Sequence, residues 1–416
     1  MQELRTLSNG VTVAYEHIPA ARTTALGVWV KSGARHEPEE LCGISHLLEH
    51  MVFKGTERRS ARVLAEEMDA IGGQINAFTA MDCTCFYARV LDTHAAQALD
   101  LLCDMVFHAR LSDADLKLER GVVFEEIGMY QDSPEDLAAD RLNAAIYSGS
   151  ALGRPILGTK KTLRAMTGET LRQYRDSHYV GPAVVVSVAG SFDEALLTEI
   201  EARFSFLPNT PAPVFDTASY TPSVTLCKKE IEQNHLCIAF PALPYGSPER
   251  FAMRLLNALV GGGMSSLLFQ SVREEAGLCY AISSFVGTYD DIGAFCIYTA
   301  THPSTEHAAL LRIRDELSAL SESITEEKLA RVRDQVISNI YMGLESTVAH
   351  MNTLANGILR EGRLVTPDEV VEALSKVTLD DVKALAKRVF DFSRASISVV
   401  GTPSARGFYR AWREKS

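Results

Sequence analysis

The chain has 416 residues and a mass of 45.6 kDa, more than one hydrophobic core ordinarily supports, since single cores stop growing near roughly 250 to 300 residues. We therefore expect at least two domains. A hydrophobic content of 46% with 23% charged residues is that of a folded globular protein and excludes a disordered chain. The net charge of −12 argues against nucleic-acid and membrane partners, and residues 1–210 carry 29 acidic against 20 basic side chains, which suits basic peptides or a metal ion.

The first ten residues lack the basic and apolar regions of a signal peptide, and no run of 18 apolar residues occurs. The eight cysteines form no CxxC pair, and most lie in apolar runs, as reduced buried thiols do. We therefore expect a cytoplasmic protein.

Each half of the chain opens with short strands. Runs rich in β-branched residues occupy 11–15 and 24–30 in the first half, and 224–226 and 236–240 in the second. A helix, a Gly-rich turn, more strands and longer helices follow in both halves. Residues 208–223 hold four of the 15 prolines and no periodic apolar pattern, which is typical of a linker. The sequence predicts domains at 1–207 and 224–416, joined by this Pro-rich linker.

The two halves look like copies of one unit. Residues 46–55 align with 254–263, and 111–116 align with 324–329, with the apolar positions kept. The polar positions diverge: His46, Glu49, His50, Glu119 and Glu126 are replaced by Arg254, Asn257, Ala258, Val332 and Asn339. Polar groups that vanish together from the second copy were not needed for the fold, so we interpret them as one site.

The site begins with a helix. His46 and His50, at i and i+4, face the same way, and Glu49 lies beside them within an arc of roughly 100°. Two neutral imidazoles suit a divalent metal, and a nearby carboxylate that does not bind the metal can take a proton from water. The alternative is a solvated helix that carries two histidines by chance, and the third ligand argues against it.

That third ligand is predicted in the segment 116–127. Glu119 and Glu126 are seven residues apart, two helical turns, and so share a face, whereas Glu125 points elsewhere. His46, His50 and Glu126 would leave a fourth position of a zinc ion open for water. Glu119 could orient one of the ligands.

These residues resemble the inverted zinc motif of the pitrilysin/insulinase (M16) metallopeptidases. In that family the ligand glutamate follows the second histidine by some 76 residues, and here Glu126 follows His50 by 76. The segments 152–159 and 261–280 resemble the short-chain branch that includes the mitochondrial processing peptidase beta subunit. One departure is Leu267, where the branch often has Arg.

The resemblance implies an α+β fold of two homologous domains, each an antiparallel sheet with helices packed on one face. It implies a zinc-dependent endopeptidase with one zinc per chain on His46, His50 and Glu126. Glu49 would act as general base, and Glu119 would assist in catalysis. Non-catalytic scaffold subunits exist among the relatives, but the complete site of this chain argues against that role.

The substrate residues are also implied by the resemblance. The strand Asn76, Ala77, Phe78 and Thr79 would pair with the substrate backbone, although it could be an ordinary edge strand. From the second half, Arg273 and Tyr280 would hold the substrate carbonyl. The alternatives are that Arg273 forms a surface ion pair and that Tyr280 is a core residue.

Extended, unfolded peptides, including basic ones, are the expected substrates. We expect a homodimer, with a hetero-oligomer that needs a partner chain as the alternative.

Overall fold

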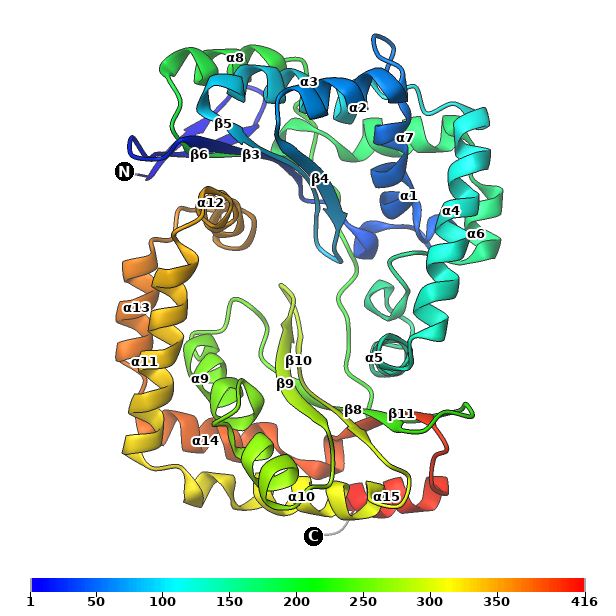
Figure 1. Cartoon of the computed structure of the whole chain (residues 1–416), viewed down its shortest axis with the longest axis vertical. Coiled ribbons are helices and arrows are strands. Elements are labelled where there is room, and N and C mark those ends of the chain that lie inside the picture. The colour runs from blue at the N-terminus through cyan, green and yellow to red at the C-terminus, as the bar shows by residue number, and fades with distance from the viewer. Residues whose placement is uncertain (1, 415–416) are drawn as a thin grey trace. The chain divides into compact units, whose positions relative to one another are not determined.

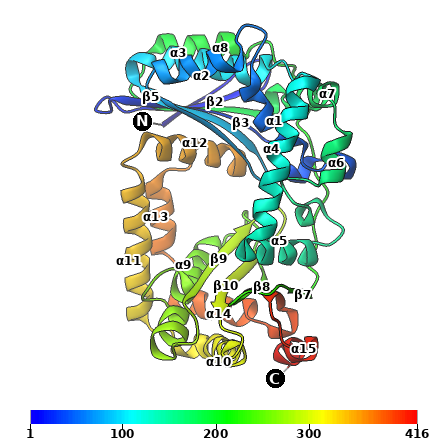
Figure 2. The ribbon, with the colours of Figure 1, turned by 45° about the vertical axis from the view of Figure 1, so that its right-hand side comes forward.

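The computed structural model describes residues 2–414 and forms two compact units. Unit 1 comprises Met1–Ile127, Arg154–Asp216 and Met342–Thr366, and unit 2 comprises Gly128–Gly153, Thr217–Tyr341 and Pro367–Ser416. Each unit is built on one mixed sheet with helices on both faces (Figures 1 and 2). No helix among the described residues has the length and apolar character needed to cross a membrane.

The sheet of unit 1 runs in the order β1-β2-β6-β3-β5-β4. β2 and β6 are parallel, and the other neighbours are antiparallel. The predicted strands at 11–15 and 24–30 correspond to β2 and β3, with ends shifted by at most two residues. The strands are β1 (Gln2–Thr6), β2 (Thr12–His17), β3 (Thr23–Val30), β4 (Gln74–Thr79), β5 (Thr84–Leu91) and β6 (Val184–Gly190).

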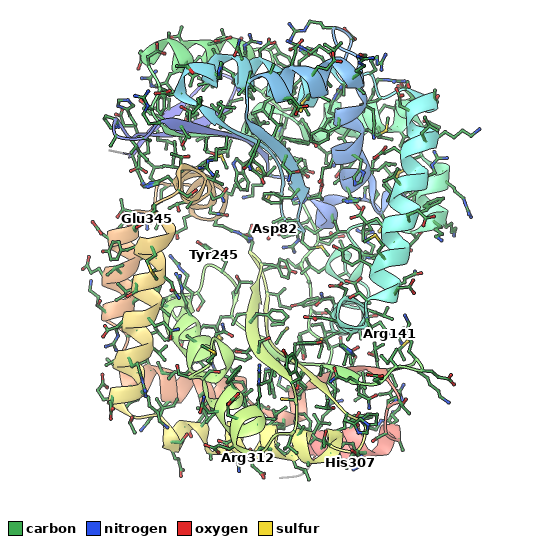
Figure 3. The ribbon with its side chains drawn as sticks, in the orientation of Figure 1. Asp82, Arg141, Tyr245, His307, Arg312 and Glu345 are labelled. Carbon is green, nitrogen blue, oxygen red and sulfur yellow. The ribbon has the colours of Figure 1, made fainter. Side chains whose placement is uncertain are left out.

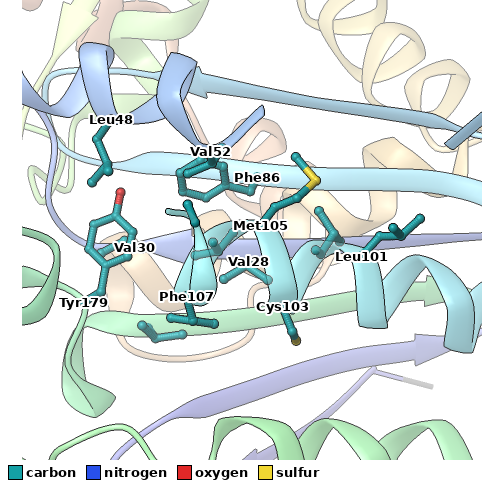
Figure 4. Packing of buried hydrophobic residues seen from close by; sticks show 14 of the residues in the cluster. Val28, Val30, Leu48, Val52, Phe86, Leu101, Cys103, Met105, Phe107 and Tyr179 are labelled. Atoms are coloured by element: carbon teal, nitrogen blue, oxygen red, sulfur yellow. The ribbon is translucent and has the colours of Figure 1, made fainter. Parts of the chain in front are cut away.

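One face of this sheet packs against helices from the first half of the chain. Along β3, Leu26, Val28 and Val30 point into this core, where they meet buried side chains of α1 and α3. Figure 4 shows Val28 and Val30 among these side chains. Strand side chains alternate between faces, so these three lie on one side. The first-half helices assigned wholly or mainly to unit 1 are α1 (Ile44–Met51), α2 (Ala61–Ala70), α3 (Ala95–His108), α4 (Asp113–Asp132), α6 (Lys160–Ala165), α7 (Gly168–His178) and α8 (Glu194–Phe204).

The opposite face of the same sheet is covered by a helix from the second half, α12 (Thr347–Glu361). Ala25 and Trp29 of β3 point to this side and pack with Met351 and Leu354, all of them buried. Both views show α12 on this face, across the sheet from α3 and α8 (Figures 1 and 2).

Unit 2 repeats the topology with the sheet order β7-β11-β8-β10-β9. This order equals that of unit 1 without β1, and the parallel pair, β7 with β11, occupies the corresponding position. The duplication predicted from the sequence is therefore present in the fold. The strands are β7 (Val224–Lys228), β8 (Asn234–Ala242), β9 (Ala281–Thr288), β10 (Gly293–Thr301) and β11 (Ser396–Gly401).

In unit 2, Leu236, Ile238 and Phe240 of β8 face the helices of the second half. Those helices are α9 (Arg250–Gly261), α10 (Glu306–Ser323), α11 (Glu326–Gly343), α13 (Pro367–Ser375), α14 (Leu379–Val389) and α15 (Arg406–Glu414), with a π-helical segment at Phe269–Glu275. A helix of the first half, α5 (Pro134–Ile146), packs on β8 and β11.

Helix α5 of the first half packs in unit 2, and helix α12 of the second half packs in unit 1. This exchange of helices changes two sequence-based expectations. Helices cover both faces of the unit 1 sheet, not one, because its second face is apolar and would otherwise be exposed. The compact units also differ from the continuous domains 1–207 and 224–416, since each half contributes one helix to the other unit. The predicted linker 208–223 contains no helix or strand.

Candidate metal centre

The helix α1 presents two histidines and a glutamate next to a fully buried apolar face. Ile44, Leu47, Leu48, Met51 and Val52, at or just beyond the helix, are buried completely and anchor it to the core of unit 1. Gly43 precedes the helix with φ of 95°, and a side chain there would meet the backbone of Gly158 at 2.6 Å. Glycine is therefore required at this start. From the helix, His46 and His50 face Glu126 of α4, and Glu49 faces Thr79 of β4.

The structure brings His46, His50 and Glu126 together. Their candidate ligand atoms all lie within 4.8 Å of one another. Glu126 Oε2 is 3.6 Å from His46 Nε2 and 3.5 Å from His50 Nε2. Glu125, the neighbour on α4, is exposed, as the predicted helical register requires.

This donor set fits a zinc ion. Ligands about 2.0 Å from a tetrahedral zinc are roughly 3.3 Å apart, close to the two nitrogen–oxygen distances here. Burial, together with the neighbouring His50, lowers the pKa of His46 to about 4, so its imidazole is neutral and keeps a lone pair for the metal at pH 7.

Glu119 lies beside the ligands rather than among them. Its Oε1 is 2.8 Å from His50 Nδ1 and accepts a hydrogen bond from the Nδ1–H group, so that Nε2 is left free to bind a metal. Lys54 Nζ contacts Glu119 Oε2 at 2.6 Å and balances the charge of this buried carboxylate. The sequence reasoning missed Lys54, although its position four residues after His50, one helical turn on, was a usable signal.

Glu49 is held by the neighbouring edge strand. Thr79 Oγ1 of β4 donates a hydrogen bond to Glu49 Oε2 at 2.6 Å. Burial raises the pKa of Glu49 above its ordinary value, while the bond from Thr79 and the nearby His50 oppose that rise. A carboxylate whose pKa is moved toward neutrality is better matched to proton transfer at pH 7.

The predicted substrate strand is the edge strand β4. It pairs only with β5 among the described strands. Ala80 N–H donates to Cys83 O, and by alternation the backbone groups of Ala77 and Thr79 point away from β5. The outward N–H of Ala77 is capped by Asn76 Oδ1 at 2.8 Å. Phe78 is 39% exposed and its ring meets that of Trp29.

Arg273 and Tyr280 lie together in unit 2. The Arg273 guanidinium stands 4.6 Å from the Phe269 ring centre and 4.9 Å from that of Tyr280. Tyr280 is 75% exposed, so it is not the core residue of the alternative interpretation. The second copy of the site region carries Arg254, Asn257 and Ala258 on α9, without the metal donors.

Comparison with known proteins extends these findings. Residues 12–160 match the model of the insulinase family, peptidase family M16, and residues 165–336 match that of the peptidase M16 inactive domain. The chain is 41% identical over 400 residues to YmxG of Bacillus subtilis, described as an uncharacterized zinc protease, with 95% of this chain and 98% of that protein covered. An uncharacterized zinc protease of Rickettsia felis is 35% identical, with 97% and 98% covered.

Solved structures share the fold. A protease from Helicobacter pylori superposes with a TM-score of 0.89 at 20% identity, covering 96% of this chain and 99% of that one. A chain of complex III from Candida albicans superposes with a TM-score of 0.86 at 21% identity, covering 99% of each.

Proposed function

Because the chain belongs to the insulinase family, peptidase family M16, we propose that it is a zinc-dependent endopeptidase. One observation carries this proposal: three metal donors, His46, His50 and Glu126, converge beside a half-buried carboxylate, Glu49, that is not one of them. We assign one zinc per chain to these donors.

The residues of this chain have separate tasks in peptide hydrolysis. Zinc, when bound, supplies the Lewis-acid activation that makes water a nucleophile at neutral pH. Glu49 accepts the proton of the attacking water on its carboxylate and returns it to the leaving amine nitrogen. Thr79 keeps that carboxylate oriented through its hydroxyl. Glu119 keeps the His50 ring in the tautomer that binds metal.

The substrate is an extended peptide that adds to β4 as a further strand. A free strand edge offers unpaired backbone groups, and pairing with them needs an unfolded segment. To expose the N–H of Ala77, the peptide must displace the Asn76 side chain. The acidic first half favours basic peptides. Arg273 and Tyr280 are assigned to the substrate carbonyl.

We expect the active form to be a homodimer, because this chain carries a complete donor set of its own. The complex III relative supports a second candidate role, a scaffold subunit without activity. The donor set of this chain disfavours it, since a scaffold needs no metal ligands. The cytoplasm stays the predicted compartment.

Replacement of Glu49 by Gln tests the proposal. The amide cannot accept a proton, so we expect zinc content near that of the parent and cleavage of a fluorogenic peptide at least ~10²-fold slower. The control is Glu40→Gln, an exposed residue before α1, which should change neither. Activity of Glu49→Gln within tenfold of the parent would exclude the general-base role. Loss of zinc in that variant would make Glu49 a ligand instead.

A further inference from the structure

One buried segment contacts both α1, called here the metal helix, and the turn that follows the predicted substrate strand β4. It comprises residues 33–37, called here the bridging segment, and follows β3 by two residues. Ala34, Arg35, His36 and Glu37 are each at most 8% exposed, although three of them carry ionisable groups. Ionisable side chains are rarely buried to this degree unless each has a specific partner.

Glu37 holds the start of the metal helix. Its two carboxylate oxygens accept separate hydrogen bonds from the backbone, Oε2 from Gly43 N–H at 2.6 Å and Oε1 from Ser45 N–H at 2.8 Å. Both amides are at the N-terminal end of α1, where backbone N–H groups lack partners within the helix. Ser45 is followed directly by His46, so this clamp fixes the helix one residue before the first metal donor.

The other end of the bridging segment holds the β4–β5 hairpin. Ala34 N–H donates to Ala80 O, and Arg35 N–H donates to Met81 O, both at 3.0 Å. The segment and the turn are so close that a Cβ on Gly33 would lie 2.3 Å from Ala80 O. The bonded carbonyls come one and two residues after Thr79, the residue that contacts Glu49.

Asp82, at the tip of this hairpin, completes the connection (Figure 3). It forms ion pairs with Arg35 at 3.1 Å and with Arg360 of α12 at 2.8 Å. The side chains of Arg35 and Asp82 are 1% and 13% exposed, so solvent screens this pair weakly. The exchanged helix from the second half therefore reaches the hairpin that carries the substrate strand.

We propose that the bridging segment sets the separation between the metal helix and β4, with Glu37 and Asp82 as positioning residues. Glu37 positions the metal donors, and Asp82 positions the strand edge and Thr79. The consequences for turnover rest on the proposed peptidase function. The consequences for local mobility and for zinc binding do not.

The first test is Glu37→Gln, with exposed Glu39→Gln as the matched control. The glutamine amide oxygen can accept one of the two backbone hydrogen bonds. Its NH₂ group is a donor and would face the other backbone N–H, so the second hydrogen bond is lost. Hydrogen exchange in residues 43–51 should rise about tenfold, while exchange in the central strand β6 stays unchanged and shows that the fold is intact. The zinc dissociation constant should rise at least about fivefold. Unchanged exchange in 43–51 would overturn the role of Glu37.

The second test is Asp82→Asn, with exposed Asp69→Asn as the control. Exchange should increase in residues 74–83 but not in 43–51, and zinc affinity should stay near that of the parent. Arg360→Gln, which removes the Asp82–Arg360 pair and keeps the Asp82–Arg35 pair, should give a smaller change of the same kind. If peptide is cleaved, KM should rise several-fold more than kcat falls, since the strand edge and not the metal is disturbed.

The two proposals fail in different ways. A parent protein that binds zinc but cleaves no peptide would contradict the peptidase assignment, while the exchange and zinc measurements would still decide the role of the bridging segment. If Glu37→Gln and Asp82→Asn both raised hydrogen exchange throughout the chain, β6 included, then Glu37 and Asp82 would contribute only to global stability. The proposal would then be wrong.

Discussion

Replacing Glu119 by Gln should weaken zinc binding without removing a ligand. The carboxylate accepts a hydrogen bond from His50 Nδ1–H at 2.8 Å and is itself paired with Lys54 at 2.6 Å. Gln can still accept from His50, but its neutral amide no longer balances Lys54. The change therefore removes one negative charge near the metal and leaves a positive charge uncompensated.

The magnitude follows from Coulomb's law. Across the imidazole ring, the Glu119 carboxylate would lie about 6 Å from a zinc on His50 Nε2. A unit charge and a divalent ion at that distance interact by about 1.4 kcal/mol at an effective dielectric constant near 80, and by about 2.8 kcal/mol near 40. The zinc dissociation constant should therefore rise about 10- to 100-fold, the range typical of partners that hold a metal ligand.

Competition with a chromophoric chelator at pH 7.5 measures this constant. Glu125→Gln makes the same charge change on an exposed side chain of the same helix and should stay within threefold of the parent. The double variant Glu119→Gln/Lys54→Met removes the uncompensated charge and should recover part of the lost affinity. A double variant no tighter than the single one would refute the electrostatic reasoning, as would a single variant within threefold of the parent.

Three further predictions concern the ligand set and stability. Glu126→Gln should reduce zinc content sharply, measured by elemental analysis after dialysis, because a tetrahedral protein site needs its third donor. Met351→Ala, at a fully buried position, should lower the free energy of unfolding by about 2–5 kcal/mol in urea titrations. Met264 is 75% exposed, so Met264→Ala should change the free energy of unfolding little. Burial lowers the pKa of His36 from 6.5 to about 4, so the parent should lose up to about 3 kcal/mol of stability as pH falls from 6.5 to 4. The variant His36→Gln should lose less stability over the same pH range, as measured by thermal denaturation. An equal loss of stability in the parent and the variant would contradict a buried neutral imidazole.

Local patterns in the sequence predicted the strands and the metal helix well. Alternating β-branched runs located β2, β3, β7 and β8 to within a few residues, because strand side chains repeat every two positions. The helical spacing of His46 and His50 predicted one shared face for the same kind of reason. The alignment of the two halves predicted that both share one fold, and the common sheet order agrees with this.

Contacts between segments that are distant in the sequence could not be predicted from local spacing. Helix α12 is amphipathic, which shows that it packs against something, but not that its partner is the sheet of the other half. Lys54, Thr79 and Glu37 are polar residues of ordinary kinds. Their roles depend on which segments the tertiary fold places next to α1.

The sequence by itself determined the doubling of the fold and predicted the type of site and its candidate donors, because each of these is encoded in spacing along the chain. Only the tertiary structure decided which helix covers which sheet face, how Glu119 and Lys54 support His50, and how residues 33–37 join the metal helix to the strand edge. Spacing specifies which side chains share a face of one element. Pairing between elements also depends on the three-dimensional path of the chain, since it joins residues up to hundreds of positions apart, such as Asp82 and Arg360.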